Sequence, residues 1–365
     1  MKIGIDISQI VYEGTGVSRF TKGLIEAILK YDNINEWVFF FSSLRENLDV
    51  GIEKKIENKG HKLIKWKLPP TLLSFLWNDL HHFPPSLPDL DWFITSDWTE
   101  PPLPDMKKAT VIHDLAYVRY PETVHETIRK TQEKRLNWVK KESQMIFADS
   151  ESTKNDLVEL LSFPNKHILV NYPGVEILKP SKNHIEDVLK KHELTNTEFI
   201  LTVGKLEPRK NFERLIQAYQ KLHNPEIQLV IVGPEGWNNL KNLKSQMSNV
   251  KILGLVSDEE LYSLYSSCLI FVYPSLWEGF GYPLIEAMQL GAPSACSKTS
   301  SLAEIGDKAV LFFNPEDTDD IAKKMGELVN SNTLRNSLES KGKERSKAFT
   351  WEKYYNTMIE GLQES

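Results

Sequence analysis

Two glutamates with glycines and a proline between them are the residues of this chain whose spacing best suits chemistry. Glu278 and Glu286 are eight positions apart, and two glycines and Pro283 lie between them. The preceding apolar run, residues 269–273, predicts a buried strand. Because a proline fits the first turn of a helix, where its missing N–H costs nothing, the pattern predicts a strand, a glycine loop and a helix start.

The amino end of such a helix suits a phosphate group, because its first N–H groups are unpaired and the helix dipole is positive there. Glu286 would lie about one turn inside the helix, where its carboxylate could accept hydrogen bonds from two ribose hydroxyls. Glu278 would stay on the loop and face whatever is attached beyond the phosphate. The alternative is a tight turn between strand and helix that carries two solvated glutamates.

Three cations follow another predicted strand, residues 199–203. Lys205, Arg209 and Lys210 lie just beyond Gly204. At the mouth of a strand they could form charge-assisted hydrogen bonds with a diphosphate. A solvated basic turn is the alternative.

His113 and Asp114 follow the predicted strand 109–112. Ligands of doubly wound folds bind at the carboxyl ends of the strands, so this pair is a second candidate for a ligand site. A hydrogen-bonded structural histidine is the alternative.

A glycine loop near the amino end, with Gly14, Gly16 and Val17, precedes a predicted helix. It is similar to the start of a dinucleotide-binding fingerprint, but Arg19 occupies the place of the third glycine. The second predicted strand also runs into two serines and lacks the acidic residue that would bind the ribose. We therefore do not expect NAD binding, and a plain turn is the alternative to a ligand-binding loop.

Length and composition indicate a two-domain globular protein. The chain has 365 residues, of which 41% are hydrophobic and 26% charged. Its net charge of −6 argues against general nucleic-acid binding. The two cysteines, Cys268 and Cys296, lack metal-ligand spacing and are expected to be small buried residues. Residue 1 leads directly into a strand and no apolar run reaches the roughly 20 residues of a membrane span, so we expect a cytoplasmic protein without a signal peptide.

Short apolar runs alternate with helical patterns in both halves of the chain. This alternation predicts an α/β fold with two doubly wound parallel sheets, facing each other across a cleft. The predicted strands span residues 3–7, 37–41, 61–68, 92–95, 109–112, 145–148, 199–203, 228–232, 250–253, 269–273, 293–297 and 309–313. Ser257 and Glu260 form a capping-box pattern at a helix start, and the polar stretch 173–197 is expected to be the linker.

The stretch from Glu278 to Glu286, with the sequence EGFGYPLIE, resembles the donor-sugar signature of the retaining glycosyltransferases of family 4. The resemblance covers nearly the whole chain and is strongest over residues 199–315. Residues 110–122 are most similar to the mannosyltransferase-like branch. The family has the GT-B fold, in which two Rossmann-like domains face each other across a cleft.

The resemblance also implies the domain organisation. In the family the last helix crosses back and packs on the first domain. Residues 1–172 together with 351–365 would form the acceptor-side domain, and residues 173–350 the domain that binds the nucleotide sugar.

The resemblance assigns roles to residues at matching positions. It implies that His113 contacts a hydroxyl of the donor sugar, with Asp114 beside it, and that the glycine loop of the first domain approaches the donor. Many family members have arginine directly after the glycine where this chain has Lys205, so we favour Arg209 and Lys210 as the diphosphate ligands. The predicted catalytic residues are His113, Asp114, Glu278, Arg209 and Lys210. The predicted donor-binding residues are Gly14, Gly16, Val17, Gly204, Lys205, Arg209, Lys210, Phe280, Gly281, Tyr282, Pro283, Leu284 and Glu286.

The implied activity is transfer of a hexose, with mannose as the first candidate, from a nucleotide diphosphate sugar to a glycan or lipid-linked saccharide in polysaccharide biosynthesis. GDP-mannose and a UDP-hexose are the candidate donors, and no metal or other cofactor is expected. The sequences Asp89-Leu90-Asp91 and Asp317-Thr318-Asp319 look like metal-binding DxD motifs, but we expect both to be structural. A GT-B epimerase or hydrolase, or an inactive homologue that binds a nucleotide sugar, is the alternative.

The segment 72–98 is rich in aromatic residues and prolines and could border the acceptor, with packing under a long loop as the alternative. Lysines at positions 54, 55, 62, 65 and 67 could contact an anionic membrane surface, which would make the protein peripheral to the membrane; a solvated face is the alternative.

Overall fold

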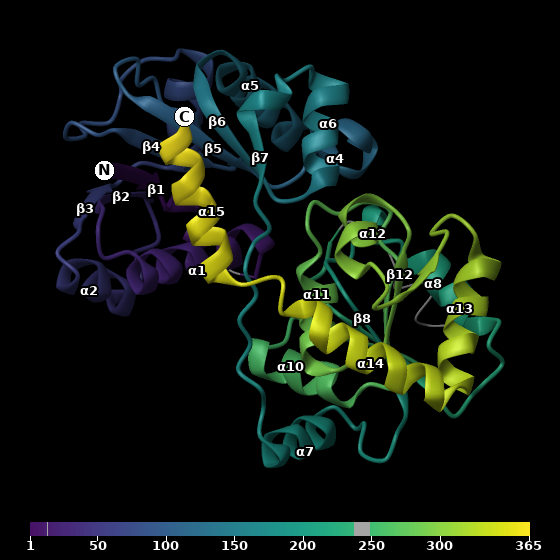
Figure 1. Ribbon diagram of the computed structural model, residues 1–365. Helices are drawn as coiled ribbons and strands as arrows, with labels where there is room; N and C mark the ends of the chain where they lie inside the picture. The colour runs from purple at the N-terminus through teal and green to yellow at the C-terminus, as the bar shows by residue number, and fades with distance from the viewer. Residues whose placement is uncertain (13, 237–248) are drawn as a thin grey trace. The chain divides into compact units, whose positions relative to one another are not determined.

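The computed structural model describes residues 1–12, 14–236 and 249–365 (Figure 1). The chain divides into two compact units, residues 1–174 with 350–365 and residues 175–349. Each unit is built around one parallel sheet with helices packed on it.

The sheet of the first unit has seven strands in the order β3-β2-β1-β4-β5-β6-β7, and every neighbouring pair is parallel. Its strands are β1 (Lys2–Asp6), β2 (Glu36–Ser42), β3 (Lys62–Trp66), β4 (Trp92–Ser96), β5 (Lys107–Ile112), β6 (Ser143–Ala148) and β7 (Ile168–Val170). The short strand β7 was not predicted.

The helices of the first unit are α1 (Gly16–Tyr31), α2 (Val50–Asn58), α3 (Pro70–Ser74), α4 (Ala116–Arg119), α5 (Glu126–Glu142), α6 (Glu151–Leu161) and α15 (Trp351–Glu364). Helix α15, in yellow in Figure 1, returns to this unit and lies beside α1. The close approach depends on Gly23, where a Cβ would lie 2.0 Å from the Trp351 ring.

The sheet of the second unit has six parallel strands in the order β10-β9-β8-β11-β12-β13. Its strands are β8 (Phe199–Val203), β9 (Gln228–Val232), β10 (Val250–Gly254), β11 (Ile270–Tyr273), β12 (Ser294–Ser297) and β13 (Leu311–Phe313). Both sheets thus confirm the predicted α/β fold with parallel strands.

The helices of the second unit are α7 (Lys182–Lys191), α8 (Phe212–Gln220), α10 (Asp258–Ser267), α11 (Tyr282–Leu290), α12 (Ser300–Gly306), α13 (Thr318–Asn330) and α14 (Asn332–Ser346). Helices α8 and α13 share one hydrophobic core with the sheet. The predicted capping box is present, because the Ser257 side chain accepts from the Glu260 N–H and the Glu260 side chain accepts from the Ser257 N–H.

The prediction of a linker over residues 173–197 is wrong for residues 182–191. Residues 182–191 form α7, which Ser181 caps and which packs against α10. Most residues of α7 are polar and Val188 is its one buried side chain, so the stretch has the composition of a linker.

Candidate functional site

The predicted basic segment and the first glutamate of the glycine loop meet in the second unit. Arg209 Nη1 lies 2.9 Å from Glu278 Oε2, and Lys210 Nζ lies 2.5 Å from Glu278 Oε1. All three groups follow the carboxyl ends of neighbouring strands, Arg209 and Lys210 after β8 and Glu278 after β11. The sheet therefore places two cations and a carboxylate together, although they come from separate motifs.

Two further residues complete this cluster and were missed from the sequence. The Tyr273 hydroxyl donates to Glu278 Oε1 at 2.8 Å and lies 3.2 Å from Lys210 Nζ. Arg209 Nη2 donates to Glu207 Oε1 at 2.9 Å. Tyr273 is the last residue of β11, so its place at a strand end was the signal that could have identified it.

The backbone of the basic segment is fixed by Asn211 and Gly204. Asn211 has a left-handed backbone at φ 59, and its side-chain amide donates to the carbonyl oxygens of Pro274 and Pro315 at 3.0 and 2.8 Å. A Cβ on Gly204 would lie 3.1 Å from Lys210 Cδ, so the glycine gives the lysine side chain room to reach Glu278. These contacts tie the basic segment to the loop that follows β11.

Glu278 is ionised in this environment although it is buried. Burial alone would raise the pKa of its carboxyl group, but Lys210 and Arg209 lower the pKa to about 2. Two carboxylates, Glu207 and Glu278, balance the two cations of the cluster. The positive charge is therefore held in place and compensated while no anionic ligand is bound.

The glycine loop ends where α11 begins, as predicted. Gly281 precedes the helix with a left-handed backbone at φ 100, and Pro283 lies in the first turn. Ser300 and Ser301 of α12, which were not predicted, fasten the loop: Ser300 Oγ accepts from the Glu278 N–H at 3.0 Å, and Ser301 Oγ donates to the Glu278 and Phe280 carbonyl oxygens.

The side chains of the other predicted donor-binding residues differ in how exposed they are. Glu286, Phe280 and Leu284 are buried, and Phe280 packs edge-on against Tyr282 with ring centroids 5.1 Å apart. A ligand would meet Phe280 and Leu284 through their backbone. Lys205 is exposed.

In the first unit, His113 forms a close pair with a residue that was not predicted. His113 Nδ1 lies 2.7 Å from Asp149 Oδ2, and the Phe20 ring meets the imidazole edge-on with centroids 4.7 Å apart. Asp149 follows β6 just as His113 follows β5, and this was the missed signal. Asp114 has a local contact, because its carboxylate accepts from the Ala116 N–H at the start of α4.

Gly14, Gly16 and Val17 lie at the amino end of α1, as predicted. Helix α1 begins at Gly16, and the Thr15 side chain caps it by accepting from the Ser18 N–H. Both glycines are exposed.

The DxD sequences have structural contacts. Asp91 accepts from the Lys2 backbone N–H, Asp317 caps α13, and Asp319 pairs with Lys221. Over residues 1–12, 14–236 and 249–365 no group of three or more His, Cys, Asp or Glu side chains could hold a metal ion. In the same ranges no helix is long and apolar enough to cross a membrane.

The aromatic segment 72–98 serves mainly as packing. Trp77, Trp92 and Phe93 are buried in the first unit, whereas Phe75 and Phe83 are exposed. Cys268 and Cys296 are buried free thiols, which confirms the prediction.

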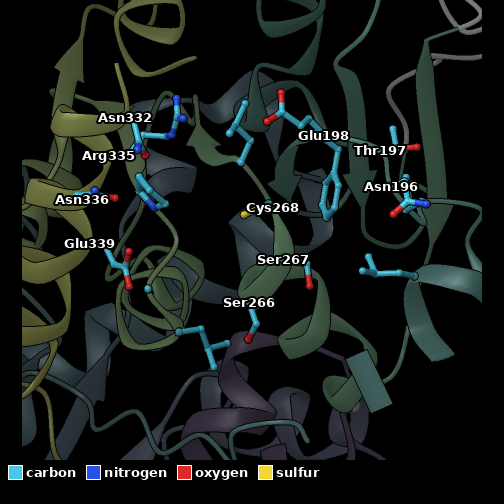
Figure 2. A pocket seen from close by; sticks show the side chains of 17 residues that line it. Asn196, Thr197, Glu198, Ser266, Ser267, Cys268, Asn332, Arg335, Asn336 and Glu339 are labelled. Atoms are coloured by element: carbon cyan, nitrogen blue, oxygen red, sulfur yellow. The ribbon is translucent and has the colours of Figure 1, made fainter. Parts of the chain in front are cut away.

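Figure 2 shows a pocket of about 720 Å³ in the second unit that contains none of the predicted site residues. It lies at the amino ends of the strands, beside Phe199 and Leu269. Two of its charged side chains are engaged locally, because Glu339 pairs with Lys343 and Arg335 donates to carbonyl oxygens in the last turn of α13. The predicted site residues of this unit lie at the opposite edge of the sheet, where β8 and β11 end.

Comparisons with known proteins give the family that part of the chain matches and the structures that share its fold. Residues 184–345 match the family described as glycosyl transferases group 1. HepE of Anabaena, solved in complex with UDP and glucose, is similar over 100% of both chains with a TM-score of 0.73 at 17% identity. WaaG, a glycosyltransferase involved in lipopolysaccharide biosynthesis, has a TM-score of 0.73 at 13% identity. The chain has the GT-B fold of these structures, and its second unit carries the match to the group 1 glycosyl transferases.

Among curated proteins, the O-antigen chain mannosyltransferase B of Escherichia coli is 27% identical over 96% of this chain and 97% of its own length. The serotype-specific mannosyltransferase WbdA of Escherichia coli is 32% identical, but the match covers 60% of this chain and only 28% of that protein. Mannosyltransferases are thus among its homologues.

Proposed function

We propose that this chain transfers a hexose, with retention of configuration and without a metal ion, from a nucleotide diphosphate sugar to a saccharide acceptor. The observation that carries the proposal is the pairing of Arg209 and Lys210 with Glu278 beside the first turn of α11. It is supported by the resemblance of the loop to a donor-sugar signature.

The cluster suits a diphosphate leaving group. An incoming diphosphate would take the charge-assisted hydrogen bonds that Arg209 and Lys210 now give to Glu278, and the N–H groups at the start of α11 would add to them. The same cations would stabilise the negative charge that develops on the leaving group as the glycosidic bond breaks. No separate metal is needed for that charge.

The two carboxylates would then accept hydrogen bonds from hydroxyl groups of the donor. Glu278, released from the cations, would accept from hydroxyls of the sugar, and Glu286 from the ribose. Retention follows from front-face attack, in which the leaving diphosphate accepts the proton of the acceptor hydroxyl. In the first unit, His113 would contact a hydroxyl of the donor sugar.

The relatives suggest which sugar is moved. Two are named as mannosyltransferases, one of the O-antigen chain. We propose GDP-mannose as the donor, with a UDP-hexose as the alternative, and a growing or lipid-linked saccharide as the acceptor. Such an acceptor would bring the enzyme to the membrane surface.

Incubation with a panel of nucleotide diphosphate sugars and mannose-containing oligosaccharides, in the presence of a chelator, tests the proposal. We expect one donor to give a product whose new linkage has the anomeric configuration of the donor by NMR, at a rate that the chelator leaves unchanged. Loss of activity restored by manganese would contradict the metal-free mechanism. Turnover of the donor without an acceptor would indicate an epimerase or hydrolase, and binding without any turnover an inactive homologue.

A further inference from the structure

The carboxylate of Asp149 is buried and is directed at one partner. Asp149 is 2% exposed, and its Oδ2 lies 2.7 Å from His113 Nδ1. Its other oxygen, Oδ1, is buried and has no hydrogen-bond partner within the described part of the chain. Burial of a carboxylate costs free energy unless a partner compensates it. Its one side-chain partner among the described residues is the imidazole of His113, so we ask what the carboxylate does for that ring.

The pair fixes which nitrogen of His113 is available. Because a carboxylate accepts hydrogen bonds, Nδ1 carries a proton toward Asp149. The other ring nitrogen, Nε2, is buried and has no partner among the residues that the structure describes. The ring is held by Phe20 at a centroid distance of 4.7 Å, and the backbone by Thr153 Oγ1, which donates to the His113 carbonyl oxygen at 3.2 Å.

We infer that Asp149 is a positioning residue for His113: it orients the imidazole so that Nε2 is available to a hydroxyl of the sugar substrate, to which the protonated ring donates a hydrogen bond. The inference rests on the proposed function in one respect, that His113 contacts the substrate. An imidazolium is a stronger donor than a neutral imidazole, and a fixed ring loses less freedom when the bond forms.

The surrounding charges favour the protonated ring. Burial by itself would lower the pKa of His113, but the carboxylates of Asp149, Asp97 and Asp114 together raise it above its usual range. The titratable side chains that act on the pair or on its neighbours are Asp97, Asp114, Arg135 and Tyr354. Burial raises the pKa of Asp149 and of Asp97, which acts against this trend, whereas His113 lowers both pKa values and Arg135 lowers the pKa of Asp97, which favours the ionised carboxylates. Burial keeps the Tyr354 phenol neutral.

NMR of the free protein tests the pair without any substrate. In protein labelled at its histidines, with the His113 signals assigned from a His113→Gln sample, we expect His113 to titrate above the usual pKa of about 6.5. In Asp149→Asn, which keeps the shape and removes the charge, the pKa should fall by about 1–3 units. A wild-type His113 that titrates at or below about 6.5 would overturn the inference even if no variant folds.

The pH dependence of transfer separates positioning from a merely structural role. Because the protonated ring is the active form, kcat/KM should decline as the pH rises through the pKa of His113. In Asp149→Asn this decline should shift to lower pH by about 1–3 units, which is the shift expected for the NMR titration. The matched control is Asp156→Asn, which removes another buried carboxylate of the same unit, bonded to Arg119, and should leave the decline in place.

The outcomes distinguish the two proposals. If the wild type transfers no sugar from any donor, the proposed function fails, while the NMR titration still tests the pair. If the wild type is active and the decline of Asp149→Asn coincides with that of the wild type, the assignment of Asp149 is wrong and the proposed function stands.

Discussion

Glu278 keeps its negative charge in the interior of the second unit because Lys210 and Arg209 lie against it. Although burial favours the neutral acid, the two cations lower the pKa from 4.5 to about 2. A carboxyl group with a depressed folded pKa stabilises the fold above its unfolded pKa, and this contribution is lost as the pH falls through the folded pKa. We expect the free energy of unfolding to decrease between about pH 4.5 and about pH 2, as measured by urea denaturation at successive pH values.

Substitution of the same residue tests the ion pairs at neutral pH. Glu278→Gln leaves Lys210 and Arg209 partly buried without this carboxylate, so we expect a loss of about 3–5 kcal/mol in the free energy of unfolding at pH 7. The further loss through the acidic window should be smaller than in the wild type, because other carboxyl groups with lowered pKa values, such as Asp32, remain. Glu327→Gln, which removes a partner of Lys324 near the surface of the same unit, should cost less than about 1 kcal/mol. Equal stability of the two variants would contradict the role of the buried pairs.

Individual site residues were predictable where a polar group follows a clear strand. Arg209, Lys210 and Glu278 were found in this way, and the structure brings them together. Their mutual pairing was not predictable, because it depends on which strands are neighbours in the sheet. Asp149 was missed although it follows a predicted strand, because it belongs to no motif. Its role depends on its contact with His113, which follows the adjacent strand.

At the scale of elements, the glycine before α11 allows the loop to turn into the helix. Gly281 has φ 100, and a Cβ there would lie 2.7 Å from Leu302 Cδ2. Gly281→Ala therefore suffers both backbone strain and a clash, and we expect the free energy of unfolding to fall by about 2–4 kcal/mol. Gly254→Ala in the same unit, with φ 74 and nothing within 4 Å, carries only the strain, and should cost about 1–2 kcal/mol. Chemical denaturation of both variants measures the difference, and equal losses would contradict the role of the close approach.

The elements that the sequence predicted well are those with strong local signals. Strands β8 and β9 were predicted with the bounds they have, since each is a mainly apolar run of five residues. Helix α7 was missed because most of its residues are polar and only Val188 is buried, and β7 was missed because three residues are too short for a periodic pattern. Tertiary packing decides both elements, which a local pattern cannot show.

At the scale of the whole molecule, the last helix completes the first unit after the chain has passed through the second. Trp351 is 8% exposed and lies where Gly23 of α1 gives it room. Trp351→Ala should lower the stability of the first unit by about 3–5 kcal/mol and leave the hydrogen-exchange protection of the second unit unchanged. Lys353→Ala, on the exposed face of the same helix, should stay within about 0.5 kcal/mol of the wild type. Equal loss of protection in both units would contradict this assignment of the helix.

The two-unit organisation was predictable from the alternation of strands and helices over 365 residues. The return of the last helix to the first unit was expected only from the family resemblance. No local pattern indicates it, because an amphipathic helix can pack on any apolar face of suitable shape.

Calorimetric titration with GDP and UDP tests most directly whether Arg209 and Lys210 bind the diphosphate of the donor. We expect one nucleoside diphosphate to bind the wild type and its affinity to fall roughly 10- to 100-fold in Lys210→Ala, because a charge-assisted hydrogen bond is lost. Lys341→Ala, an exposed lysine of the same unit, should bind like the wild type. If folded Lys210→Ala binds the nucleoside diphosphate as tightly as the wild type does, the assignment of the basic segment to the diphosphate is wrong.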